Sequence, residues 1–412
     1  MEINNNSVPV VILQFNHGSL GIARTLGRLG VPIYAIDSDP KKPELASKYC
    51  TKVFIWDINK EPVMDSLNFL FELSQELNKP SILIPTSDST TEFVAGNGEF
   101  LKKYYIFPHQ SYKLVKSLTC KKEMYFLAKK HGVDTPEAFF PESREDLSKF
   151  LKIGEFPVML KRISGTSLNI HNEPNIVKIH NEKDLLEQYD KWEDSENPNF
   201  MLQEYIPGGE DSVWMFNGYF NDKSECLIGI TGKKIRQRPP YKGCASLGIC
   251  LQNEHVDTTT RNFMAEIGYQ GILDIGYRFD ARDGKYKVLD INPRIGSSFR
   301  LFVGDNGLDV VQALYLHLTE QPVPPTKIVE GRKWMVEDQD LASCIVYYKD
   351  GKLTLKEFFR SLQGIKETAW FAFDDIKPFL KLFPFDIKKE FKKVLESRLS
   401  KINRNPPFWK DT

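Results

Sequence analysis

The feature that most constrains the fold is a short, continuous apolar segment near the start of the chain, Pro9–Phe15, which is rich in valine and isoleucine. A strand without polar alternation is buried on both faces, and such strands belong to parallel sheets covered by helices. A glycine-containing helical segment, His17–Gly27, and a second apolar segment, Val31–Ile36, follow it. The pattern predicts a right-handed βαβ unit and therefore an α/β fold.

The same pattern continues downstream. Ser66–Leu77 has helical periodicity, and Ser81–Pro85 is another apolar strand that ends in the polar residues Thr86–Asp88. Open α/β sheets bind their ligands at the carboxyl ends of their strands. We therefore predict a small α/β domain at the N-terminus that has a binding role.

The composition narrows the classes of function. The chain has 412 residues, 41% of them hydrophobic, which is enough for several domains with sizeable cores. Its 55 Lys and Arg residues balance its 55 Asp and Glu residues, so we expect no nucleic-acid partner. The start lacks a signal-peptide pattern and no apolar run is long enough to span a membrane, so we expect a cytoplasmic protein. The six cysteines form no CxxC or metal-ligand pattern, and we expect them to be reduced.

The middle of the chain changes from mixed helices and strands to mostly strands. A helix is predicted over residues 117–131, where Gly132 ends it. The next predicted elements are the strands Phe156–Arg162, Ile176–His180 and Phe200–Ile206 and the helix Glu182–Trp192. Beyond residue 210 the clearest are the strands Ser212–Phe216, Ser224–Thr231, Gly271–Phe279 and Tyr286–Ile291 and the helices Arg261–Ile267 and Leu308–Leu318.

The segment Gly284–Arg294 carries the sharpest chemical pattern. Side chains alternate along a strand, so Asp290 and Asn292 lie on one face, and their oxygens are ligands suited to Mg²⁺. Asp274, on the preceding strand, would add a third oxygen if the two strands pair. The segment alone fits equally well a capped turn followed by ordinary Asn–Pro turn chemistry.

In context, the segment resembles the Asp/Glu-x-Asn-Pro-Arg signature of the ATP-grasp superfamily. The resemblance implies that Asp290 and Asn292 bind Mg²⁺, or Mn²⁺ in its place, beside ATP. Arg294, in phase with them, is then expected to stabilise charge on the transferring phosphoryl group. The family usually has a carboxylate where this chain has Gly276, and we expect Asp274 to replace it. If Asp274 does not, that metal position is vacant.

Other segments follow the order of the family's nucleotide-binding motifs. Lys121, with Lys122 as an alternative, occupies the position of one phosphate-binding lysine, and Lys161 occupies the second. Each lysine alone is equally typical of a solvated surface, although an apolar strand delivers Lys161 inward. Ser164 and Gly165 begin a segment that resembles the phosphate lid, with fewer glycines than usual. The adenine hinge is matched by the sequence from Gln203 to Glu210, and the nucleotide contacts implied there are Glu204, Tyr205, Ile206, Glu210 and Asp211.

A basic run, GKKIRQRPP, lies between residues 232 and 240. It is typical either of a solvated hairpin or of arginines that bind triphosphate or an anionic acceptor. Arg236 is our candidate for the second role, and Arg300 is a further arginine that could face the cleft.

The resemblance, which spans roughly residues 8–320, implies a fold that is both α/β and α+β. It consists of a Rossmann-like pre-ATP-grasp domain (residues 1–115) and a two-part ATP-grasp domain (116–205 and 206–325, the second with the metal site). A C-terminal extension follows (326–412). The implied activity is an ATP-dependent ligase that activates a carboxylate as an acyl phosphate and joins it to an amine or a thiol. Small-molecule carboxylate and amine substrates are the expected partners, and homodimers are common in the family.

Two alternatives stay open. His17–Gly21 contains a GxxG pattern and Asp37 ends the second strand, as in an NAD(P)-binding oxidoreductase. In ATP-grasp ligases this domain instead binds the carboxylate substrate, and amides at a helix N-terminus suit an anion. The second alternative, a non-catalytic nucleotide-binding scaffold, is supported only by Gly276.

The C-terminal extension is basic and aromatic towards its end, where Lys388, Lys389, Lys392 and Lys393 cluster. Such a segment is typical of a helix packed on its own domain with a solvated basic face. It also fits peripheral contact with an anionic membrane or with a protein. The extension's layout resembles predicted ATP-grasp carboligases of bacteria.

Overall fold

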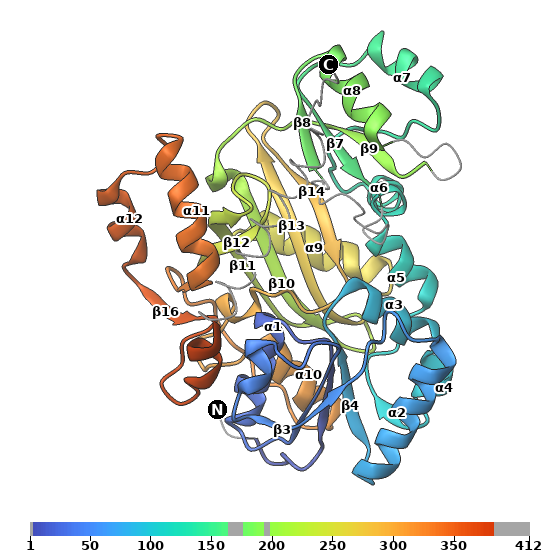
Figure 1. Ribbon diagram of the computed structural model, residues 1–412, viewed down its shortest axis with the longest axis vertical. Coiled ribbons are helices and arrows are strands. Elements are labelled where there is room, and N and C mark those ends of the chain that lie inside the picture. The colour runs from blue at the N-terminus through green and yellow to red at the C-terminus, as the bar shows by residue number, and fades with distance from the viewer. Residues whose placement is uncertain (1–2, 164–175, 193–197, 383–412) are drawn as a thin grey trace, which may run out of the picture.

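A computed structural model of the chain describes residues 3–163, 176–192 and 198–382 (Figure 1). Helices and strands alternate in the mixed α/β fold that the sequence predicts, and the described strands form three sheets. The sheet formed by residues 10–106 (blue) and the sheet formed by residues 138–204 (mostly green) lie at opposite ends of the molecule, with long strands between them (Figure 1). The predicted lid residues Ser164 and Gly165 lie outside the described residues, as do the lysines from 388 to 393.

The first sheet is parallel throughout and has the order β3-β2-β1-β4-β5. All four residues of its central strand are buried, which confirms the prediction drawn from their continuous apolar sequence. Its strands are β1 (Val10–Leu13), β2 (Ile33–Asp37), β3 (Cys50–Ile55), β4 (Ser81–Pro85) and β5 (Tyr105–Ile106). Its helices are α1 (His17–Gly27), α2 (Val63–Leu77), α3 (Asp88–Gly96) and α4 (Gly98–Leu101), with the 3₁₀ turn η1 (Pro43–Ala46).

Polar residues at the ends of these strands are used for capping. The side chain of Asn16 accepts hydrogen bonds from the amides of Gly18 and Ser19 and so caps α1. Ser87 caps α3 in a similar way: its hydroxyl oxygen accepts from the amide of Thr90, and its own amide donates to the hydroxyl oxygen of Thr90. The predicted cluster at residues 86–88 therefore serves first to begin a helix.

The sequence predicted a single helix over residues 117–131. This prediction was wrong, because the helical segment is interrupted at Cys120. The structure has α5 (Tyr112–Thr119) and α6 (Lys121–Lys130), separated by Cys120, whose backbone is extended with φ −85° and ψ 116°. The amide of Lys121 donates to the carbonyl of Ile163 at 3.3 Å, which ties the start of α6 to the next sheet. The break thus fixes Lys121 at a helix N-terminus.

The second sheet is antiparallel, with the order β6-β9-β7-β8. A compact core of its own holds the sheet against two helices, with Leu147, Leu185 and Tyr189 almost fully buried. Its elements are β6 (Ala138–Phe139), α7 (Arg144–Leu151), β7 (Val158–Arg162), β8 (Ile176–Ile179), α8 (Glu182–Trp192) and β9 (Phe200–Glu204).

The third sheet has the order β14-β13-β10-β11-β12-β15-β16 and forms the body of the molecule. Its strands are β10 (Val213–Phe220), β11 (Cys226–Arg238), β12 (Cys244–Cys250), β13 (Gly271–Asp280), β14 (Lys285–Asn292), β15 (Lys333–Met335) and β16 (Ile365–Thr368). Its helical elements are η2 (Glu210–Ser212), α9 (Glu254–Glu266), η3 (Phe299–Leu301), α10 (Val310–Leu318), α11 (Glu337–Lys349) and α12 (Leu355–Leu362).

The third sheet continues beyond residue 325. β15 pairs with β12 and β16 pairs with β15, so the described part of the extension continues the central sheet. The extension also contacts the N-terminal part of the chain. Asp375 accepts hydrogen bonds from Arg24 of α1 (3.0 Å) and from Ser47 (2.7 Å). Both partners of this ion pair are buried, and removing one partner of such a pair costs about 3–5 kcal/mol.

All six cysteines are free. Burial raises the pKa of Cys226, Cys250 and Cys344 to about 12, so these thiols stay protonated and unreactive. Within the described ranges, no helix is both long enough and apolar enough to cross a lipid bilayer.

Candidate active site

A cleft of about 840 Å³ lies between the second sheet and the third. It is lined by residues of β7, β8 and β9 on one side and of β10 to β14 on the other. Nine of the residues singled out from the sequence line it: Lys121, Lys161, Glu204, Tyr205, Ile206, Glu210, Asp274, Asp290 and Asn292. Three others, Asp211, Arg236 and Arg294, do not.

The pairing of β13 with β14 builds the acidic wall. Asp274 lies directly opposite Asn292, and Gly276 lies opposite Asp290. The amide nitrogen of Asn292 donates to Asp274 Oδ2 at 3.3 Å. Burial raises the pKa of Asp274, against the opposing effect of Arg294 and Lys234. A cation placed here would stabilise the ionised carboxylate.

The donor set fits Mg²⁺, because it consists of two carboxylates and one amide oxygen, all hard ligands. Among the described residues no group of three or more His, Cys, Asp and Glu side chains could hold a metal. The protein therefore offers few oxygen ligands for Mg²⁺. This is usual at sites where the phosphates of a bound nucleotide complete the coordination of the ion. At Gly276 an added Cβ would meet no atom within 4 Å, so a carboxylate side chain has room there.

Two lysines form the basic wall. Lys161, on β7, is only 8% exposed, and its ammonium group donates to Gln203 Oε1. Burial lowers the pKa of Lys161 to about 8, helped by the nearby charges of Lys121 and Arg278 and opposed by Asp290. Like charges gathered in a buried site are stabilised by an anion, so this wall suits a phosphate.

The hinge carboxylate, Glu204, is already paired. Lys287 lies 3.3 Å from Glu204 Oε2, the amide of Glu137 donates to the same oxygen at 3.1 Å, and Arg282 bonds the other oxygen. Sequence reasoning missed Lys287, because its strand, β14, mixes charged and apolar residues and does not single it out. The side chain of Ile206, next along the hinge, is buried.

The sequence prediction for Arg236 was wrong. Its guanidinium is buried and bonds both oxygens of Asp340, at 2.9 and 2.7 Å, and the hydroxyl of Ser361. The register of β11 against β12 shifts on both sides of Arg236, so this residue turns away from the cleft. Lys234, Gln237 and Arg238 line the cleft instead.

Arg278 is the arginine that the sequence argument missed. It lies on β13, two residues beyond Gly276 and four beyond Asp274, so the same alternation could have identified it. It lines the cleft and donates to the carbonyl of Gly208 at 2.7 Å. Its Nε atom is buried without a hydrogen-bond partner, and burial lowers its pKa.

Arg294 and Arg300 hold parts of the structure together. Arg294 donates to Asp88 at 2.6 Å and to Asn292 Oδ1 at 3.2 Å, linking the first domain to the acidic wall. Arg300, which we expected near the cleft, is paired with Asp309 and Glu367.

The contacts at the N-terminal domain argue against the dinucleotide alternative. A Cβ at Gly18 would lie 2.8 Å from the Cα of Ser297, and one at Gly21 would lie 2.8 Å from the ring of Phe299. These glycines therefore serve close packing of α1 on the third sheet's loop. Asp37 is buried and accepts from Lys42 (2.7 Å) and the amide of Phe15 (2.6 Å), so its carboxylate is already committed.

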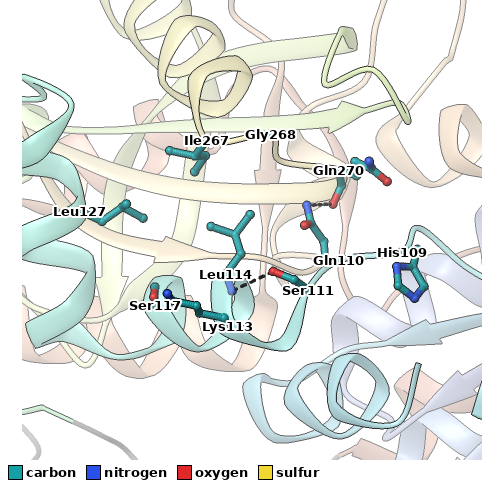
Figure 2. A pocket seen from close by; sticks show the side chains of 10 residues that line it. All are labelled: His109, Gln110, Ser111, Lys113, Leu114, Ser117, Leu127, Ile267, Gly268 and Gln270. Carbon is teal, nitrogen blue, oxygen red and sulfur yellow. Dashed lines mark hydrogen bonds between the residues drawn. The ribbon is translucent and has the colours of Figure 1, made fainter. Parts of the chain in front are cut away.

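A second hollow, of about 460 Å³, lies beside α5 and the turn before β13 (Figure 2). Gln110 donates to the carbonyl of Gln270 there at 2.8 Å, and Ser111 caps α5 (Figure 2). None of the site residues predicted from the sequence lines it. The predicted site residues that line a hollow therefore all lie in the larger cleft.

The cleft lies between two sheets, with Lys121 and Lys161 on one wall and the oxygens of Asp274, Asp290 and Asn292 on the other, as the resemblance to ATP-grasp enzymes predicts. The chain has a mixed α/β fold of the ATP-grasp type, which it shares with the solved structures described below.

Comparison with known proteins supports this assignment. No family model matches the chain. The D-aspartate ligase of Enterococcus faecium (strain Aus0004) is 25% identical over 326 residues, which are 76% of each chain.

Solved structures share the fold at lower identity. The ADP complex of N5-carboxyaminoimidazole ribonucleotide synthetase superposes with a TM-score of 0.61 and 13% identity, covering 79% of this chain and 81% of the other. The L-amino acid ligase from Bacillus licheniformis gives a TM-score of 0.59 and 14% identity, covering 78% of each chain. The biotin carboxylase domain dimer of Hydrogenobacter thermophilus 2-oxoglutarate carboxylase gives 0.59 and 17% identity, over 78% and 72%.

The pKa of Lys161 generates a prediction. A lysine with a pKa of about 8 is charged below that pH and loses its charge above it, so affinity for an anion should fall as the pH rises through 8. For ATP as the varied substrate, kcat/KM should decline above pH 8, because this ratio reports the free enzyme. Lys161→Arg keeps its charge over that range, and its profile should lack the decline. A decline of the same size in Lys161→Arg would contradict the assignment.

Proposed function

We propose that the larger cleft binds MgATP and uses it to activate a small-molecule carboxylate, which an amine then attacks. The observation that carries the proposal is the meeting of Lys121 and Lys161 with Asp274, Asp290 and Asn292 in one cleft. The smaller hollow beside α5 is lined by none of these groups. The oxidoreductase alternative leaves their convergence unexplained.

Each wall has a distinct role in the proposal. Asp274, Asp290 and Asn292 would hold Mg²⁺ (or Mn²⁺), which when bound neutralises phosphate charge and orients the nucleotide. Lys121 and Lys161 contact the phosphates. Arg278 takes the role predicted for Arg236, which is to bind the triphosphate or an anionic acceptor. Positioning and electrostatic stabilisation then supply most of the rate enhancement.

The proposed reaction has two steps. A carboxylate oxygen of the substrate attacks the γ-phosphorus of ATP, giving an acyl phosphate and ADP. The amine nitrogen then attacks the acyl carbon, phosphate leaves, and the nitrogen loses a proton to give an amide. Glu204, Tyr205, Ile206 and Glu210 hold the adenosine end. For Asp211, which does not line the cleft, and for Ser164 and Gly165, the nucleotide contact stays a prediction.

We propose an amino acid as one substrate, with D-aspartate as the first candidate. The name and 25% identity of the Enterococcus relative support this choice. The N-terminal domain, a Rossmann-like arrangement with strand order β3-β2-β1-β4-β5, is the proposed substrate-binding part. A homodimer and a membrane or protein contact through the end of the extension stay predictions.

A hydroxylamine trap tests the activity before the acceptor is known. Hydroxylamine replaces the amine and converts an acyl phosphate to a stable hydroxamate, so donor carboxylates can be screened alone. With MgATP, we expect D-aspartate or a related amino acid to give hydroxamate and ADP in equal amounts. EDTA and the variant Asp290→Asn should both abolish the product. Thermal stabilisation by NADH but not by MgATP, with no hydroxamate from any carboxylate, would contradict the proposal.

Asp274 and Gly276 offer a second test. If Asp274 replaces the usual carboxylate, Asp274→Asn should lower kcat about 10²-fold and raise the Mg²⁺ concentration needed for half-maximal rate. Adding Gly276→Asp to that variant should restore part of the activity, since the space there is open. Asp222→Asn, on the exposed turn after β10, is the matched control. An unchanged Mg²⁺ requirement in Asp274→Asn would exclude Asp274 as a ligand.

A further inference from the structure

Helix α11 of the C-terminal extension reaches the nucleotide end of the cleft through Tyr347. The hydroxyl of Tyr347 donates to Glu210 Oε1 at 2.6 Å, and it accepts a hydrogen bond from the amide of Tyr241 at 3.1 Å. Tyr347 is 4% exposed, and its ring packs edge-on against that of Tyr241 with centroids 4.8 Å apart. This contact joins the extension to a residue that lines the cleft.

Glu210 lies in a short turn, and neighbouring side chains hold its carboxylate. It begins the single turn η2, directly after Gly208 and Gly209, and Gly208 has a positive φ of 128°. Glycines leave the backbone with more accessible conformations than other residues. The carboxylate is held on its two oxygens by different side chains, Tyr347 on one and Gln237 on the other. Each oxygen keeps a second lone pair for a ligand hydroxyl.

The helix that carries Tyr347 is itself firmly anchored. Asp340, one turn into α11, accepts two hydrogen bonds from Arg236 and a third from Ser246 at 3.0 Å. Arg236 and Asp340 are both buried. The buried pair that removes Arg236 from the cleft therefore fixes α11 against β11 and β12, the strands that form the cleft wall.

Tyr347 is suited to be a permanent donor. Burial raises its pKa, and the hydrogen bond to Glu210 raises it further, so the hydroxyl stays protonated at neutral pH. Donation from a neutral hydroxyl to a carboxylate is a strong, short hydrogen bond. The carboxylate is thereby oriented while its charge is kept.

We propose that Tyr347 is a positioning residue that holds Glu210 in place for the ribose hydroxyls of the nucleotide, so that the extension forms part of the ATP site. This inference rests on the proposed function, in which Glu210 holds the adenosine end of the nucleotide, and it adds that the contact is made to the ribose hydroxyls. It predicts that selectivity for the ribose depends on a residue outside the ATP-grasp signature.

The test compares Tyr347→Phe with Tyr348→Phe, its exposed neighbour (57% exposed). Loss of a hydrogen bond to a charged group should raise the KM for ATP about 10-fold in Tyr347→Phe, with kcat within about twofold. The preference for ATP over 2′-deoxyATP or 3′-deoxyATP should shrink in the same variant. Tyr348→Phe should match the wild type in every measurement.

A second variant separates positioning from general damage. Glu210→Gln should weaken the same ribose preference, and the double variant with Tyr347→Phe should lose little more than either single one, because both act through one carboxylate. An unchanged ribose preference in Tyr347→Phe, or equal losses for ATP and both deoxy analogues, would overturn the inference. Failure of the wild type to bind MgATP in calorimetry would overturn the proposed function as well. Normal binding with an unaltered preference would overturn the role of Tyr347 alone.

Discussion

The antiparallel pairing of β13 with β14 is the constraint on which the site depends. It sets Asp274 beside Asn292 and leaves Gly276 opposite Asp290. On the other face of the same strands, Ile275 and Ile291 are paired and buried in the core beneath. A slip of one residue would exchange the two faces, bringing apolar side chains to the cleft and carboxylates to the core. Hydrophobic burial on one face thus fixes the chemistry on the other.

The C-terminal extension joins other parts of the chain through ion pairs that are buried or half-buried. Asp340 holds Arg236, Asp375 holds Arg24, and Glu367 holds Arg300, so three strands or helices outside the extension depend on its carboxylates. Such pairs are costly to break on one side only, because the remaining charge stays buried. The extension is therefore part of the architecture that keeps α1 and the cleft walls in fixed relation.

Much of the fold could be predicted from local pattern. The continuous apolar sequence of β1 indicated a buried parallel strand, and alternation placed Asp290 and Asn292 on one face. Lys161 was recognisable because an apolar strand delivers it. These features follow from the spacing of apolar residues along the chain, which can be read directly from a sequence.

The errors came from features that a sequence does not display. The register shifts around Arg236 turn that residue towards α11, and nothing in the basic run marks them. Cys120 adopts an extended conformation inside a helical pattern, and the next residue, Lys121, donates its amide to the carbonyl of Ile163 far along the chain. Gly18 belongs to a GxxG pattern that fits a dinucleotide-binding turn, yet its lack of a side chain allows close contact with Ser297, more than half the chain away. Arg278 was missed although its spacing from Asp274 was visible.

The central claim is that Asp274, Asp290 and Asn292 hold a divalent ion beside the nucleotide phosphates. Crystals grown with Mn²⁺ and a non-hydrolysable ATP analogue would test it directly through the anomalous scattering of manganese. The account predicts an anomalous peak within bonding distance of Asp290 and Asn292, with Asp274 as a further ligand and the phosphates facing Lys161. A nucleotide bound elsewhere, or a metal peak away from all three residues, would contradict it.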